Sequence, residues 1–489
     1  MGRSVEEERK DLSKLEEDEE VEVIVIPCPA QGHINPLLQF AKHLLAHHPS
    51  LKITLPLILT NNSSNNNHST VTQYQTLTPS LTIHHIPLLP YQGLDHPESK
   101  RAFWERRQAS IRSHLTHLLT SNPNIACVVY DAFMPWVLDI LKQFGVSSAA
   151  FFTQSCAVNA IYYNVYKGWL SVPLEKQRSI SLDGLPPLCP SDFPSFVSYP
   201  IKYPDILKLL TTDQFTRLDE ADWIFTNTFD SLEPQEVKWM EGEFAIMKNI
   251  GPMVPSMYLD GRLENDKDYG VSMFESNNNK DSTMKWLDSK HNKSVIYVSF
   301  GSAAELEKEQ MEELACALKL TNKYFLWVVR ESEIHKLPHN FVEDHEDTAG
   351  DQKGLVVNWC SQLQVLAHKS IGCFVTHCGW NSTLEALSLG LSLVTMAQWS
   401  DQPTNAKYVE DVWKIGKRVR LMEEDNGICR REEIELCVNE VMDEEGEVSE
   451  EIRKNLRKWR ELAKEAMADG GTSHANIIHF VQQLSNKTN

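Results

Sequence analysis

The stretch THCGWNSTLEALSLG occupies residues 376–390, directly after the short apolar run at 373–375. The apolar run is typical of a buried parallel strand, whereas Leu384, Leu387 and Leu391 are spaced as on one face of a helix. Gly390 is a residue type that commonly ends a helix. The stretch is therefore predicted to be a strand–turn–helix junction. The free backbone N–H groups and positive dipole end of such a junction suit a phosphate group.

A second interpretation of these residues needs no ligand. Ser382 and Glu385 have the spacing of a capping box, in which the two side chains satisfy the first turn of a helix. A helix cap does not account for His377, Trp380 and Asn381, however. Both interpretations stay open at this point.

The composition limits the class of protein. At about 100–200 residues per domain, 489 residues predict two or three domains, or two large ones. The 47 basic and 67 acidic residues give a net charge of −20, which argues against a nucleic-acid or anionic-membrane partner. A phosphate site would then have to be built locally, from helix ends and hydrogen bonds.

Targeting signals and cysteines indicate the compartment. The ten cysteines form no CxxC pair and lie mostly in apolar runs, which predicts free thiols in a reducing environment. We find no signal peptide, and no apolar run of the ~18 residues that a membrane span needs. We therefore expect a cytoplasmic monomer without a membrane span. Residues 1–20, with nine acidic and four basic side chains, are predicted to be a disordered tail.

Two series of alternating strands and helices follow this tail. Strand patterns end near residues 27, 60, 87, 130, 153 and 227 in the first series, and near 300, 329, 359, 376 and 396 in the second. The alternation predicts the α/β class, with two facing Rossmann-like domains and a cleft between them. We place these domains at 21–250 and 286–465, with a polar linker at 251–285. The last segment, 466–489, is expected to be a helix that packs back on the first domain.

In such sheets, ligands gather at the carboxyl ends of the strands. The polar residues expected at these ends are His33, Asp131 and Thr153 in the first domain, and Ser302, Trp359, Gln362, Asp401 and Gln402 in the second.

His33 is the candidate base. It comes just before a helix predicted at 35–47, whose positive end disfavours imidazolium, so we expect a neutral ring that can accept a proton. A carboxylate such as Asp131 could hold the other ring nitrogen and stabilise the charge that forms. The alternative is a histidine that only caps or packs at the helix entry, because the sequence does not show that the two residues are close.

Motif searches argue against several other chemistries. No GxGxxG, GxxxxGK[ST] or GxSxG pattern occurs, which argues against a dinucleotide dehydrogenase, a P-loop NTPase and an ordinary serine hydrolase. Asp266 and Asp268 flank a lysine in the linker, and we interpret them as a solvated charge run. A metal-dependent transferase that uses these two aspartates is the alternative.

Residues 359–402, WCSQLQVLAHKSIGCFVTHCGWNSTLEALSLGLSLVTMAQWSDQ, resemble the signature box of the plant secondary-product UDP-glycosyltransferases. The resemblance covers nearly the whole chain from about residue 21, including QGHINPLLQFAKHL, VVYDAFMPW and FFTQSCAVNA. These stretches resemble the subgroup that glucosylates small acids, thiohydroximates, triterpenes and steroids. Ser361 and Ser392 stand where this box usually has proline, and neither change removes a reacting group.

The resemblance implies an inverting enzyme of the GT-B fold, with UDP-glucose as co-substrate in the second domain and neither a metal nor another cofactor. It implies that His33 and Asp131 are catalytic. It further implies that UDP is bound by Ser302, Trp359, Gln362, His377, Asn381, Ser382 and Glu385, and the sugar by Thr153, Trp380, Asp401 and Gln402.

The acceptor is expected in the first domain. Candidate walls are aromatic or uncharged, which favours an apolar steroid or triterpenoid over a phenolic or carboxylic acid. Each wall residue could equally be core, and the sequence places no Arg or Lys there for an acidic acceptor. A non-catalytic nucleotide-sugar-binding protein is a further alternative, against which intact His33 and Asp131 argue. The candidate walls are Phe133, Met134, Phe193, Phe196 and Tyr199.

Overall fold

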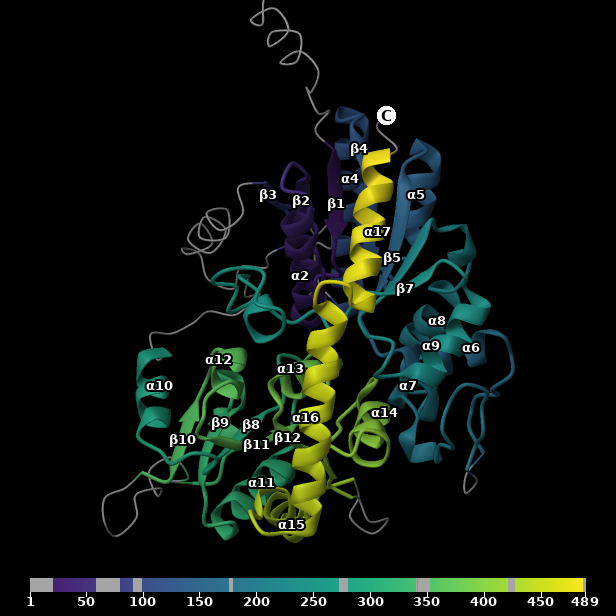
Figure 1. Ribbon diagram of the computed structural model, residues 1–489. Helices are drawn as coiled ribbons and strands as arrows, with labels where there is room; N and C mark the ends of the chain where they lie inside the picture. Colours follow the sequence, from purple (N-terminus) through teal and green to yellow (C-terminus); the bar gives the residue numbers. More distant parts are fainter. Residues whose placement is uncertain are drawn as a thin grey trace, which may run out of the picture.

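The computed structural model describes residues 21–58, 80–90, 99–175, 179–271, 280–339, 341, 352–420 and 427–486. The described residues form two parallel sheets with helices packed around them (Figure 1). The strand order is β3-β2-β1-β4-β5-β6-β7 in the N-terminal sheet and β10-β9-β8-β11-β12-β13 in the C-terminal sheet. The prediction of an α/β protein with two Rossmann-like domains is confirmed. The predicted tail at 1–20 lies outside the described residues.

The N-terminal sheet consists of β1 (Glu22–Ile26), β2 (Lys52–Leu57), β3 (Leu81–His85), β4 (Ile125–Asp131), β5 (Ser147–Phe152), β6 (Trp223–Thr226) and β7 (Met247–Asn249). Its helices include α2 (Gln31–His47), α4 (Lys100–Ser121), α5 (Trp136–Phe144), α6 (Cys156–Tyr166), α7 (Ser195–Ser198), α8 (Pro204–Lys208) and α9 (Pro234–Glu243).

The C-terminal sheet consists of β8 (Val295–Ser299), β9 (Tyr324–Val328), β10 (Gly354–Val357), β11 (Ile371–Thr376), β12 (Ser392–Thr395) and β13 (Gly416–Arg418). The helices after the linker are α10 (Lys280–Asp288), α11 (Lys308–Leu320), α12 (Gln362–Leu366), α13 (Trp380–Leu389), α14 (Gln402–Lys407), α15 (Arg431–Met442), α16 (Glu447–Met467) and α17 (Thr472–Asn486).

The strands read as continuous apolar runs because helices cover both faces of each sheet. Every residue of β8 and β12 is buried, and β1 is buried from its second residue onward. Such burial is the rule for parallel sheets, whose crossover helices lie on both faces. The carboxyl ends of β1 and β4 meet because the two strands are paired in parallel, with Ile26 opposite Tyr130.

Two helices begin earlier than the sequence predicted, and both changes affect the candidate site. Helix α2 starts at Gln31, so His33 lies inside its first turn and not before it. Helix α13 starts at Trp380 with Gly379 as its N-cap. Ser382 is therefore the third helical residue. The capping-box interpretation is wrong, and Ser382 and Glu385 have no capping role.

The last helix, α17, lies against the N-terminal domain, whereas α16 runs along the C-terminal domain (Figure 1). The ring of Phe480 lies 5.0 Å from that of Phe225 and 5.4 Å from that of Trp223. The hydroxyl of Ser473 donates to the carbonyl of Gly251 over 2.6 Å. The chain therefore passes between the domains twice, once through the linker and once between α16 and α17.

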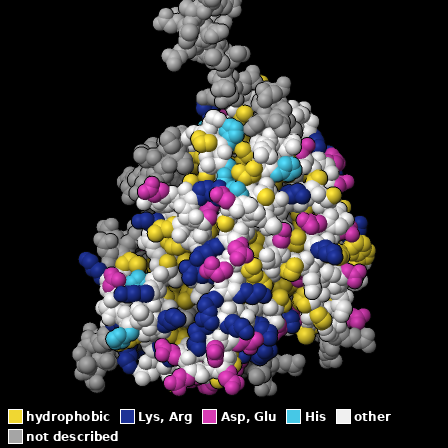
Figure 2. Space-filling model, viewed as in Figure 1, with side chains coloured by type: hydrophobic (Ala, Val, Ile, Leu, Met, Phe, Trp, Pro, Cys, Tyr) yellow, Lys and Arg dark blue, Asp and Glu magenta, His cyan; other side chains and the backbone are white. Residues whose placement is uncertain are grey.

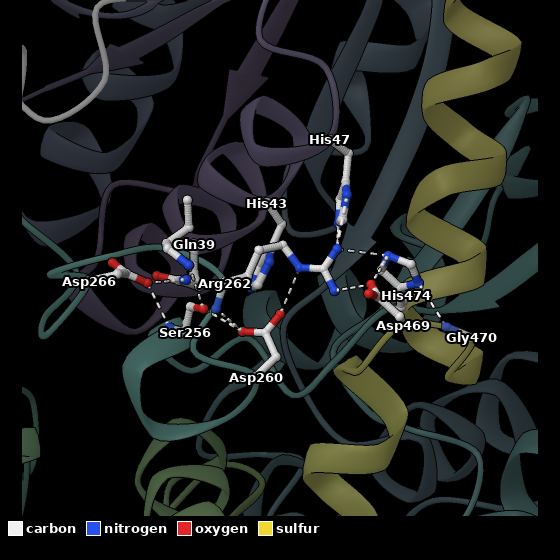
Figure 3. A network of polar contacts seen from close by, with 11 residues as sticks. Gln39, His43, His47, Ser256, Asp260, Arg262, Asp266, Asp469, Gly470 and His474 are labelled. Carbon is white, nitrogen blue, oxygen red and sulfur yellow. Dashed lines mark hydrogen bonds and ion pairs between the residues drawn. The ribbon is translucent and has the colours of Figure 1, made fainter.

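The prediction for Asp266 is wrong. Its side chain is only 6% exposed and forms an ion pair of 2.7 Å with Lys42 of α2. It also accepts hydrogen bonds from the Gln39 amide over 2.8 Å and from the backbone N–H of Ser256 over 2.7 Å (Figure 3). The linker thus folds back onto α2. These bonds occupy the carboxylate, which argues against the alternative of a metal site at Asp266 and Asp268.

The same network reaches the final turn before α17. Arg262 of the linker donates to His474 over 2.9 Å and forms an ion pair of 2.7 Å with Asp469 (Figure 3). His47, at the end of α2, lies 3.3 Å from the same guanidinium. The linker, α2 and the α16–α17 turn are therefore fastened together at one point.

The surface charge is unevenly distributed although the chain carries a net charge of −20. Figure 2 shows Lys and Arg side chains gathered over α16, the helix that runs down the centre of that view. The middle of this helix, residues 453–460, carries five basic and no acidic side chains.

Among the described residues, no helix combines the length and apolarity needed to span a bilayer.

Candidate active site

The candidate base is held at the carboxyl edge of the N-terminal sheet. Nδ1 of His33 lies 2.7 Å from Oδ2 of Asp131, the last residue of β4. The carboxylate has no exposed surface and also accepts the backbone N–H groups of Cys28, over 3.3 Å, and Phe133, over 2.9 Å. These bonds fix its orientation. Because Nδ1 faces Asp131, Nε2 of His33 remains available for a substrate proton.

The electrostatic surroundings make His33 more basic than a free imidazole. Burial is the largest single influence on the pKa of His33, and it lowers that pKa. The charge of Asp131, the hydrogen bond to Asp131 and the charge of Asp401 all raise the pKa, and together they outweigh burial. The net shift is upward. The sequence prediction considered only the positive end of the helix, which would lower the pKa of His33. It could not include the larger opposite effect of a carboxylate 2.7 Å away, because the sequence does not show that distance.

Of the residues predicted to bind the sugar, one contacts this base and a second influences its pKa. The hydroxyl of Thr153 is 3.1 Å from Nδ1 of His33. Asp401, from the C-terminal domain, is close enough for its charge to raise the pKa of His33. Burial raises the pKa of Asp401 itself, while a hydrogen bond from Asn405 opposes that shift. The two domains thus contribute polar groups to one site.

The N-terminus of α13 faces the base across the domain boundary. The amide of Asn381 donates to the carbonyl of Gly32, next to His33, over 2.7 Å. Trp380, Asn381 and Ser382 are the first three helical residues, so their backbone N–H groups have no partner within the helix. These N–H groups and the helix dipole favour an anion at this position.

His377 is packed between two glycines at this end of α13. A Cβ on Gly301 would lie 2.8 Å from Cε1 of His377, and one on Gly379 would lie 2.6 Å from Nε2. Burial lowers the pKa of His377 to about 4. The ring is therefore neutral at pH 7, and it offers a ligand a hydrogen bond and not a positive charge.

We expect Gly301→Ala to weaken UDP binding roughly 10-fold. The added Cβ would push His377 out of place, and Gly301 has a φ of +70°, at which an L residue carries about 1–3 kcal/mol of strain. Isothermal titration calorimetry with UDP checks this. Gly242→Ala in α9 is the matched control, because its Cβ would meet nothing within 4 Å. Equal Kd values for the two variants would contradict the packing argument.

A third group of residues surrounds Glu385, one turn further along α13. Gln362 donates to Oε2 of Glu385 over 2.8 Å and to the hydroxyl of Ser382 over 2.9 Å. Oε1 of Glu385 accepts the hydroxyl of Tyr269 over 2.9 Å. Sequence analysis missed Tyr269 because it belongs to the linker, and no local pattern indicates which residue of a linker turns into a site. Trp359, predicted to bind UDP, is half-buried at the same edge of the sheet.

UDP affinity is expected to fall by roughly 10-fold as the pH is lowered from about 8.5 to 5.5, beyond the change that the titration of UDP itself causes. Burial raises the pKa of Glu385 to about 7, and an ionised carboxylate is the better acceptor for the hydroxyl groups of UDP. Tyr269→Phe should move the midpoint to higher pH, because the tyrosine hydroxyl stabilises the ionised form. Calorimetry across this range gives the midpoints.

Glu385→Gln is the reference for that experiment, because it keeps the shape of the side chain and cannot titrate. The pH dependence of the wild type minus that of this variant isolates Glu385. Identical profiles for the two proteins would show that Glu385 does not contribute to the pH dependence.

Several predicted site residues have structural partners that limit their roles. The indole N–H of Trp380 donates to the carbonyl of Asn227 over 2.7 Å, so only its backbone N–H remains for a sugar. Oε1 of Gln402 accepts two backbone N–H groups, from Gln398 and Trp399, which leaves its NH2 group. Ser302 follows β8 at the carboxyl edge and is half-buried.

Three of the five proposed acceptor-pocket residues are buried in the hydrophobic core. Met134, Phe193 and Phe196 are at most 2% exposed and belong to the hydrophobic core. Tyr199, by contrast, is 65% exposed. Only Phe133 lies next to the base, with its ring 4.6 Å from that of His33.

Comparison with known proteins agrees with this geometry. The family model described as UDP-glucoronosyl and UDP-glucosyl transferase matches residues 262–446. UDP-glycosyltransferase 74E2 of Arabidopsis thaliana is 46% identical over 470 residues, which cover 94% of this chain and 98% of that protein. Mogroside I-E synthase of Siraitia grosvenorii is 44% identical over 463 residues, with the same coverage.

Among solved structures, Os79 from O. sativa in complex with UDP superposes with a TM-score of 0.82 at 36% identity, covering 94% of this chain and all of that one. A structure of the Phytolacca americana enzyme UGT2, complexed with UDP-2fluoro-glucose and pterostilbene, gives a TM-score of 0.77 at 26% identity. The paired sheets, the histidine–aspartate pair and the opposing helix terminus are thus found in a chain that belongs to the UDP-glycosyltransferase family.

Proposed function

We propose that this enzyme transfers glucose from UDP-glucose to a hydroxyl group of an apolar small molecule, with inversion at the anomeric carbon and without a metal ion. The observation that carries the proposal is the contact between Asn381 and Gly32, over 2.7 Å. It brings the anion-binding end of α13 next to the turn that holds His33. A sugar bonded to a phosphate at α13 would therefore lie within reach of the base.

The proposed reaction uses His33 as general base. Nε2 takes the proton of the acceptor hydroxyl while the oxygen attacks the anomeric carbon. The bond between that carbon and the phosphate oxygen breaks, and UDP leaves with the electron pair, through an oxocarbenium-like transition state. Asp131 stabilises the imidazolium that forms. The N–H groups at the start of α13 stabilise the charge of the departing diphosphate.

The acceptor class is supported by the name of one relative. A relative at 44% identity is named mogroside I-E synthase, and mogrosides are triterpenoid glycosides. This supports a triterpenoid or steroid acceptor over a phenolic one. We also propose that the protein works as a cytoplasmic monomer, in keeping with its ten free cysteines.

The test is release of UDP from UDP-glucose, measured in EDTA against steroids, triterpenoids, phenols and small aromatic acids. Acceptor-dependent release with a β-linked glucoside as product is the expected result. Activity that is lost in EDTA and restored by Mg²⁺ or Mn²⁺ would overturn the metal-free part of the proposal. UDP binding without transfer to any acceptor would instead favour a nucleotide-sugar-binding protein.

A further inference from the structure

The helix α4 carries an arginine to the edge of the sheet where the base lies. Because α4 leads into β4 and the strands are parallel, α4 runs back along the sheet and begins at the carboxyl edge. Arg107 is in its second turn. Burial and the charge of Asp131 raise the pKa of the Cys28 thiol, just beyond the end of β1, and the charge of Arg107 opposes this rise, which places the guanidinium in the neighbourhood of that thiol. The backbone N–H of Cys28 in turn binds Asp131, the partner of His33.

Arg107 has no counter-ion in the described part of the chain. Its Nε is shielded from solvent and has no hydrogen-bond partner there, and no carboxylate is among the groups that influence its pKa. The ring of Phe103 lies under the guanidinium, with Cζ 4.9 Å from the ring centroid. Burial lowers the pKa of Arg107, so its environment disfavours the charge that it carries.

Two neighbouring arginines on the same helix, unlike Arg107, have polar partners. Arg101 forms an ion pair of 3.0 Å with Glu105, and Arg106 donates to the carbonyl of Leu89 over 2.7 Å. Of these three arginines, Arg107 is the one whose Nε is buried without a hydrogen-bond partner in the described part of the chain. A partly buried guanidinium without an anion is costly, and it offers a planar pair of donors that matches a carboxylate.

We propose that Arg107 binds a carboxylate of the acceptor, so that the preferred acceptors are hydroxy acids with an apolar skeleton. In this arrangement the hydroxyl of the acceptor reacts at His33. Its carboxylate is held by Arg107, on the other side of the loop between β1 and α2 that contains Cys28. This inference rests on the proposed glucosyl transfer and narrows its acceptor class. It also differs from the sequence-based expectation, which placed no basic residue near the acceptor, because a helix face can be assigned to a site only once its packing is known.

The experiment compares a triterpenoid hydroxy acid with its methyl ester, which keeps the skeleton and hydroxyl but not the charge. A phenolic acid and its ester form a second pair. We expect the wild type to prefer each acid over its ester by roughly 10- to 100-fold in kcat/KM, the factor that charged hydrogen bonds supply. Arg107→Met should lower kcat/KM for the acids by that factor and change the values for the esters less than about 2-fold.

Two controls make the result specific. Arg106→Met removes the adjacent arginine, which has its own backbone partner, and should leave the preference for acids intact. Resistance of the glucoside to mild alkali shows that the hydroxyl, and not the carboxylate, received the sugar.

Other outcomes would overturn the inference in distinguishable ways. Equal rates for acids and esters in the wild type, or an equal loss for both in Arg107→Met, would overturn it and leave the transferase standing. Alkali-labile products would overturn the assignment of the carboxylate to Arg107. No transfer to any acid, ester or neutral acceptor would overturn the proposed function, and the inference with it.

Discussion

Replacing His33 with alanine is expected to lower kcat by a factor of about 10²–10⁴ and to leave the Kd for UDP nearly unchanged. The imidazole is bound to Asp131 and Thr153 of the N-terminal domain, whereas the anion-binding N–H groups belong to α13. Removing the ring therefore removes the base without altering the nucleotide site. Steady-state kinetics with UDP-glucose and calorimetry with UDP measure the two quantities separately.

The control for this variant is His117→Ala, which removes an exposed histidine of α4 far along the helix from Arg107. It should behave as wild type in both assays. His33→Gln adds a second comparison, because glutamine keeps a polar side chain but cannot take up a proton near neutral pH. If His33→Ala lost UDP affinity as strongly as it lost turnover, His33 would be a nucleotide ligand and not the base.

The sequence predicted the sheets and most of the edge residues because these depend on short-range patterns. Apolar runs of five or six residues indicate parallel strands, and the polar residue after each run then falls at the carboxyl edge. His33, Asp131 and Thr153 are predicted in this way, and in the structure side-chain oxygens of Asp131 and Thr153 lie 2.7 Å and 3.1 Å from Nδ1 of His33. Their meeting requires only that β1, β4 and β5 be adjacent, as they are.

The residues that sequence analysis missed or misplaced depend on contacts across large separations. Tyr269 reaches Glu385 across 116 positions, and Asp266 reaches Lys42 across 224. No periodicity records such contacts. The burial of the aromatic residues could not be predicted for a related reason, since nothing in the local sequence distinguishes Phe196 from Phe133. Only tertiary packing makes the first 2% exposed and places the second beside the base.

Asp131→Asn is expected to lower kcat by about 10²–10⁴ and to move the acid limb of the pH profile to lower pH. Catalysis needs neutral His33, so kcat/KM in the wild type should rise with pH through a midpoint above the ordinary value of 6.5, because Asp131 raises the pKa of this histidine. Without the carboxylate charge, burial dominates and lowers that pKa. The variant should therefore be slower at every pH, while its midpoint falls below that of the wild type.

The loss in maximal rate follows from the hydrogen bonds of the carboxylate. Both oxygens of Asp131 accept N–H groups: Oδ1 from Phe133, and Oδ2 from Cys28 and from His33. An asparagine must point its NH2 group at one of these donors. If it faces His33, the ring is forced into the wrong tautomer, with the proton on Nε2 where the substrate must react. If it faces Phe133, the loop that orients the side chain loses a bond.

The pH profile of kcat/KM between about pH 5 and 9 distinguishes this role from a purely structural one, because kcat/KM reports the pKa of the free enzyme. Asp139→Asn, which removes a half-exposed carboxylate of α5 paired with Arg217, should change neither rate nor midpoint. A structural defect would lower the active fraction and leave the midpoint where it is. A midpoint that stayed in place in Asp131→Asn would therefore show that the carboxylate does not set the basicity of His33, whatever the fall in rate.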